Sequence, residues 1–102
     1  MAADTMNAMV IEDIAHREGV GLARMRLERL QRFGCPVPKI WPPLLAANAI
    51  IAEDLAREGA VEPSDVPRLA EMIEEHAALE WASIMGRLPA RVEFDHEALR
   101  NA

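Results

Sequence analysis

The stretch IEDIAHREGVGLARMRLERL, residues 11–30, decides how the N-terminal half of this 102-residue chain folds. Apolar residues recur at helical spacing before Gly19, and glycine readily takes the left-handed conformation that ends a helix. We therefore predict a first helix that begins near Asp4 and ends at Gly19. A second helix is predicted over residues 21–33, with Gly34 as its stop.

Prolines separate this half from the rest of the chain. The segment CPVPKIWPP, residues 35–43, contains four prolines, which exclude a helix and favour an extended connector. Beyond it, the pattern predicts a third helix up to Gly59 and a longer fourth helix capped by Ser64 or Asp65. The prediction is one all-α domain of four main helices: a basic helical hairpin (1–34), the connector (35–43), an acidic helical hairpin (44–88) and a tail (89–102).

The predicted fourth helix carries a continuous apolar stripe at spacings of three and four residues, formed by Val66, Leu69, Ile73, Ala77, Trp81, Ile84 and Leu88. Met72, His76 and Leu79 widen this stripe on one side. One interpretation is a central helix packed within the monomer. The other is a homo-oligomer assembled through Leu69, Met72, Ile73, Leu79 and Ile84.

Charge is distributed unevenly along the chain. The formal net charge of −6 taken alone argues against a nucleic-acid partner. Residues 17–39, however, carry six basic and two acidic side chains, whereas residues 53–80 carry nine acidic and two basic ones. Such asymmetry suggests different partners for the two halves.

Four arginines of the predicted second helix lie away from its apolar stripe of Ala23, Leu27 and Leu30 when the residues are placed at 100° intervals. Arginine offers a fixed fork of donors that suits phosphate oxygens. The predicted phosphate contacts are Arg24, Arg26, Arg29 and Arg32, with Lys39 assisting. The alternatives are a solvated arginine face, ion pairs with the acidic faces of the later helices, and contacts with another acidic partner.

Residues 11–30 resemble the helix-turn-helix of phage and bacterial DNA-binding proteins. Ala15, Gly19 and Met25 fall at that family's separations for a small residue, a turn glycine and an inward apolar residue, and IAHREGV reads like its first helix and turn. Glu28 departs from the pattern, because the family places an inward apolar residue there. In size, helical order and charge layout the chain is also similar to the small terminase subunits of tailed phages and gene transfer agents, which implies a ring that presents DNA to a packaging motor.

The sequence gives little support to enzymatic chemistry. His76 lacks a glutamate three residues earlier. The pairs Asp13–His16 and Glu93–His96 have the ligand spacing, but the first lies near the N-terminus and the second in the tail, and such pairs often occur by chance. Cys35 is the only cysteine, so an intramolecular disulfide is excluded. We predict no catalytic residue, no metal and no cofactor. Cytoplasmic location is expected, because neither a secretory leader nor a membrane-spanning run is present.

Two functions remain from different classes. The first is a non-catalytic, oligomeric DNA-associated protein, either a small-terminase-like packaging component or a compact regulator. The second is a protein–protein adaptor that binds a partner through the acidic long helix and an exposed Trp41 in the connector. A tryptophan between helices can instead pin the connector to the core, and this is the interpretation we favour for Trp41.

Overall fold

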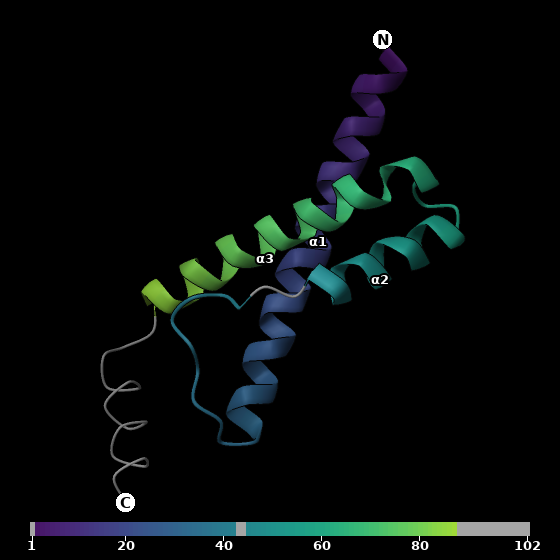
Figure 1. Ribbon diagram of the computed structural model, residues 1–102. Helices are drawn as coiled ribbons and strands as arrows, with labels where there is room; N and C mark the ends of the chain where they lie inside the picture. Colours follow the sequence, from purple (N-terminus) through teal and green to yellow (C-terminus); the bar gives the residue numbers. More distant parts are fainter. Residues whose placement is uncertain (1, 43–44, 88–102) are drawn as a thin grey trace, which may run out of the picture.

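The computed structural model describes residues 2–42 and 45–87 (Figure 1). The helices are α1 (Ala2–Arg32), α2 (Leu45–Arg57) and α3 (Val66–Arg87), with a single 3₁₀ turn, η1 (Pro63–Asp65), directly before α3. The described residues contain helices and no strand, so the prediction of an all-α chain is confirmed. The predicted number of four main helices is wrong: three are present in the described part of the chain.

The difference lies at Gly19, through which α1 runs without interruption. Gly19 lies where α1 crosses α3: a Cβ added to it would be 2.6 Å from the Cβ of His76 and 2.8 Å from both the backbone nitrogen of Ala77 and the backbone oxygen of Ile73. Only a residue without a Cβ lets the two backbones approach so closely. The predicted helix end at Gly19 is therefore wrong, and the two-helix arrangement expected for residues 11–30 is absent.

The other two predicted glycine stops are confirmed. Gly34 and Gly59 have φ values of 66° and 82°, the left-handed conformation that glycine adopts without strain. After α1, the backbone N–H of Cys35 donates to the carbonyl of Leu30 at 2.8 Å, and that of Gly34 donates to Gln31 at 3.2 Å. This pair of bonds is the Schellman motif, and it recurs after α2 around Gly59.

Helix α3 packs against both α1 and α2 and forms the centre of the fold (Figure 1). One group of buried side chains joins all three helices: Ile11, Ile14, Ala15, Ala52, Val61, Leu69, Ala70 and Ile73. The predicted stripe of α3 is confirmed where Leu69, Ile73, Ala77 and Trp81 are fully buried. Leu69 and Ile73 are therefore used inside the monomer, and they do not lie on a surface open to a second copy.

The connector folds back onto α1 and α3 and is pinned there by two tryptophans. Trp41 is 6% exposed, and its ring meets that of Trp81 edge to face at a centroid distance of 5.3 Å. The indole N–H of Trp81 donates to the carbonyl oxygen of Pro38 at 2.8 Å. Residues 35–42 are not helical, as predicted, and Trp41 is a core residue rather than an exposed docking residue.

The molecule is elongated, measuring 58 × 22 × 16 Å along its principal axes. Its radius of gyration of 16.5 Å exceeds the roughly 13 Å expected for a compact domain of about 100 residues. Figure 1 shows why: the N-terminal end of α1 extends past the other helices, and its C-terminal end extends in the opposite direction from the crossing with α3. Leu88 and the predicted tail, 89–102, lie outside the described residues.

Candidate nucleic-acid interface

Arg24, the first of the four predicted phosphate contacts, is already ion-paired. Its Nε donates to the Oε2 atom of Glu80 on α3 at 3.1 Å. The Arg24 side chain remains 71% exposed, whereas that of Glu80 is only 12% exposed. At this position the structure matches the alternative in which arginines of the basic half neutralise acids of the acidic half.

Arg26 is partly buried and does not belong to an exposed row of arginines. Its guanidinium carbon lies 5.3 Å from the centroid of the Trp41 ring, within the range of a cation–π interaction. Its Nη1 atom is buried and has no hydrogen-bond partner within residues 2–42 and 45–87. The predicted orientation of Arg26 away from the core is therefore wrong, because the connector folds over the face of α1 that carries it.

Arg29 and Arg32 are exposed and lie in the last turn of α1. Arg32 donates from Nη2 to the Oε1 atom of Glu28 at 2.7 Å, but both side chains are about two-thirds exposed, at 65% and 68%. Exposed pairs four residues apart on a helix contribute only about 0.3–0.5 kcal/mol, so an incoming phosphate can compete for Arg32. Within the described residues, Arg29 makes no ion pair.

These side chains surround a hollow at the C-terminal end of α1, which we call the arginine hollow. It has a volume of about 460 Å³ and is lined by Arg26, Arg29, Leu30, Arg32, Phe33 and Cys35. Lys39 is exposed in the connector and does not line the hollow. The structure thus brings three of the five predicted contacts together and places Arg24 and Lys39 elsewhere.

Phe33 is the lining residue that sequence reasoning missed. The residue is 74% exposed. Phe33 is one of two phenylalanines in the chain. The sequence predicts it as the last residue of a helix, and in the structure it directly follows α1 and precedes Gly34 of the Schellman motif. An aromatic residue next to a helix stop and a cluster of arginines was the available signal.

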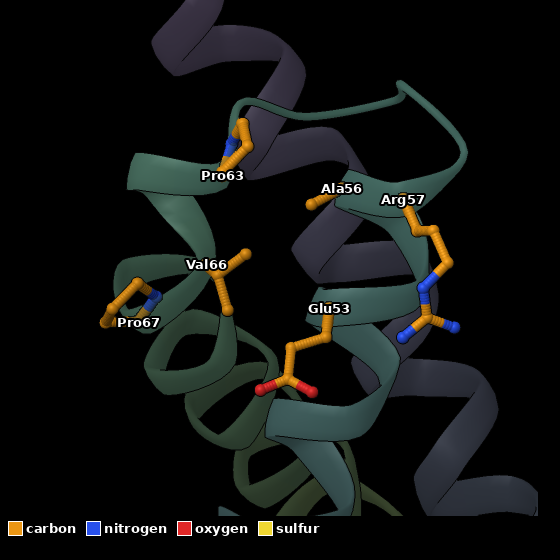
Figure 2. A pocket seen from close by; sticks show the side chains of 6 residues that line it. All are labelled: Glu53, Ala56, Arg57, Pro63, Val66 and Pro67. Atoms are coloured by element: carbon orange, nitrogen blue, oxygen red, sulfur yellow. The ribbon is translucent and has the colours of Figure 1, made fainter.

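A second hollow lies between α2 and the start of α3 (Figure 2). It measures about 480 Å³ and is lined by Glu53, Ala56, Arg57, Pro63, Val66 and Pro67. Figure 2 shows Val66 pointing into the gap toward α2, while Arg57 lies on the side of α2 away from Val66. Arg57 pairs with Asp54 at 3.0 Å on its own helix. This hollow offers an alanine, a valine and two prolines, with no convergent set of like charges.

A polar network crosses the interior near the connector. The indole N–H of Trp41 donates to Glu74 Oε1 at 2.7 Å, and the side-chain amide of Asn48 donates to Glu74 Oε2. Asn48 is fully buried, and its Oδ1 atom has no hydrogen-bond partner in the part of the chain that the structure describes. Glu74 therefore holds the connector and α2 against α3, which makes it a structural carboxylate rather than part of a solvated acidic face.

Two histidines face each other where α1 crosses α3. The Nδ1 atoms of His16 and His76 are 3.4 Å apart, and His76 Nε2 lies 2.6 Å from Glu12 Oε1. In the described part of the chain, no group of three or more histidine, cysteine, aspartate or glutamate side chains is placed to hold a metal ion. The Glu93–His96 pair lies outside that part.

Beside these histidines lies a groove of about 330 Å³ between α1 and α3, which we call the crossing groove. It is lined by His16, Val20, His76, Leu79 and Glu80. Leu79 is 67% exposed, whereas Met72 and Ile84 are partly buried. Of the five residues predicted to mediate self-association, Leu79 thus presents the largest free apolar surface.

Comparison of the chain with family models, with curated proteins and with solved structures found no match. None of the helices in residues 2–42 and 45–87 combines the length and apolarity that a membrane span requires.

Proposed function

We propose that this chain is a non-catalytic, DNA-associated helical protein that binds nucleic acid mainly through phosphate contacts. The observation that carries the proposal is the arginine hollow, where Arg26, Arg29 and Arg32 gather at the end of α1. Arg29 and Arg32 are the contacting side chains. Arg26, held against Trp41, supplies positive charge from behind them.

Local charge supports this assignment despite the net charge of −6. The C-terminal end of a helix carries the equivalent of about half a negative charge, which repels anions. Three guanidinium groups around the hollow outweigh that half charge. Among the described residues, only Arg32 of these three shares its charge with a carboxylate, the exposed Glu28. Because the acidic remainder of the chain opposes association, we expect binding to be weak and strongly salt-dependent.

Self-association is the second part of the proposal. The crossing groove presents Leu79 beside Val20, and a second copy can cover this apolar surface. Met72 and Ile84 are partly buried on the same helix. A small oligomer with several arginine hollows would gain nucleic-acid affinity through multivalency, as in the small terminase subunits that the chain resembles in size and charge layout.

The test is binding of the purified protein to a labelled random duplex at salt concentrations from about 20 to 200 mM, over which phosphate-driven affinity falls steeply. In the double variant Arg29→Gln/Arg32→Gln, affinity should fall for all sequences alike, and the salt slope should flatten by about one to two units. The matched control Arg57→Gln/Arg68→Gln removes the same charge outside the hollow and should bind almost as wild type does. Equal binding by both double variants would refute the assignment.

A protein–protein adaptor is the competing function. The burial of the Trp41 side chain argues against an adaptor that uses this residue as an exposed contact. The crossing groove, with Leu79 exposed, is the observation that favours an adaptor. If the protein bound no nucleic acid even at the lowest salt concentration, we would conclude that it is a protein–protein adaptor.

A further inference from the structure

We propose that the arginine hollow binds single-stranded nucleic acid, with an unpaired base stacked on Phe33 and the neighbouring phosphates held by Arg29 and Arg32. This inference rests on the proposed function and names the form of nucleic acid that the site selects. The observation behind it is that a largely exposed aromatic ring and three guanidinium groups line the same hollow.

The exposure of Phe33 distinguishes this site from a simple phosphate-binding surface. At 74% exposure, its ring contributes little to the core. It belongs neither to the buried group that joins the three helices nor to a second buried group, the tryptophan cluster of Ala23, Trp41, Ala77 and Trp81. Leu30, its neighbour in the hollow, packs against the tryptophan cluster and fixes that side of the helix. The ring is therefore a free apolar surface on a firmly held helix end.

A single strand can contact both the exposed ring of Phe33 and the guanidinium groups, whereas a regular duplex can contact only the guanidinium groups. Proteins that bind single strands combine a positive surface for the backbone with aromatic side chains on which bases stack. In a regular duplex the bases are already stacked on one another, so Phe33 would gain no contact there. A volume of about 460 Å³ is within the roughly 300–1,000 Å³ of small-ligand sites, which suits one nucleotide unit.

The positions of Arg29 and Arg32 next to Phe33 suit contacts with the nucleic-acid phosphates that flank the stacked base. Arg29 precedes Phe33 by one helical turn, and Arg32 is its immediate neighbour. Cys35 also lines the hollow, and its backbone N–H donates to the Leu30 carbonyl. The hollow is thus built from one helix end and its own stop, and it needs no rearrangement of α2 or α3.

The experiment compares three labelled probes of equal length at about 20 mM salt, a concentration at which phosphate contacts are strong. The probes are oligothymidylate, a random duplex, and an abasic strand that has phosphates but no bases. Wild-type protein should bind oligothymidylate most tightly. Phe33→Leu, which keeps an apolar side chain, should weaken binding to oligothymidylate by about 5- to 100-fold and leave the other two affinities unchanged.

The controls separate this inference from the proposed function. Arg29→Gln should weaken binding to all three probes, because each of them carries phosphates. Equal affinity of Phe33→Leu and wild type for oligothymidylate would overturn the stacking inference while duplex binding still supported the proposed function. A loss of duplex affinity in Phe33→Leu would also overturn it and would indicate a ring inserted between base pairs. No binding to any probe would overturn both.

Discussion

Replacing Gly19 by alanine should destabilise the chain, although alanine favours helices more than any other residue. In the interior of an exposed helix, the change from glycine to alanine contributes about 1 kcal/mol of stability. At Gly19 the new methyl group would lie 2.6 Å from the His76 Cβ and 2.8 Å from two backbone atoms of α3. Backbone atoms cannot rotate away as the end of a long side chain can, so α1 and α3 must separate.

Overpacking a tight core typically costs about 1–3 kcal/mol, and contacts with two backbone atoms place Gly19→Ala near the upper limit. After subtraction of the gain in helix propensity, the expected net loss is about 2 kcal/mol. For a domain of this size, such a loss lowers the melting temperature by about 8–16 °C. The tryptophan cluster should lose its packing in the same transition, because Ala77 belongs to it.

Gly21→Ala is the matched control in the same helix. A Cβ at this position would meet no atom within 4 Å, so the only effect is on helix propensity. We expect a gain of about 0.5–1 kcal/mol. Urea denaturation followed by circular dichroism and by tryptophan fluorescence measures both variants. If Gly19→Ala were as stable as Gly21→Ala, the interpretation of Gly19 as a crossing-point residue would be refuted.

Two further predictions follow from burial. Glu74→Leu should lower the free energy of unfolding in urea by about 1–3 kcal/mol, because it leaves the donors of Trp41 and Asn48 unpaired. The control Glu75→Leu, on the exposed side of α3, should change the free energy of unfolding by less than about 0.5 kcal/mol. Equal losses in the two variants would contradict the structural role of Glu74. Leu79→Glu should reduce the molar mass measured by light scattering and leave the fold intact, since Leu79 is 67% exposed, whereas Ile73→Glu should unfold the chain. A wild type that is monomeric at high concentration would end the proposal of self-association.

The contrast among the glycines shows what the sequence can and cannot predict. At Gly34 and Gly59 the helix stop is made by two hydrogen bonds, one from the glycine to the residue three positions earlier and one from the next residue to the residue five positions before it. The relevant information is therefore local, and the prediction succeeds. Gly19 is needed because α1 closely approaches the backbone of Ile73 and Ala77, which lie more than fifty positions away in the chain. Nothing in residues 11–30 indicates this contact. The apolar stripe of α3 was predictable for the same reason as the stops, because helical spacing is a local property.

The candidate site was predicted in part for a related reason. Helical periodicity placed the arginines of α1 relative to its own apolar stripe, and Ala23, Leu27 and Leu30 do pack against the tryptophan cluster. Periodicity carries no information on which other element covers a face. The connector covers Arg26 with Trp41, and α3 supplies Glu80 to Arg24, so neither is as free as the helical projection suggested.

The continuity of α1 makes the two proposed activities separable. Val20 in the crossing groove and Arg29 in the arginine hollow lie on the same helix, nine residues or about 14 Å apart along its axis. Effects of substitutions more than about 7–10 Å apart usually add. Apart from the small repulsion by its added charge, Leu79→Glu should therefore lower nucleic-acid affinity through loss of multivalency, and a monomer should keep most of the intrinsic affinity of one arginine hollow. If Leu79→Glu also abolished binding to a probe short enough for a single hollow, the two surfaces would belong to one composite site formed between copies.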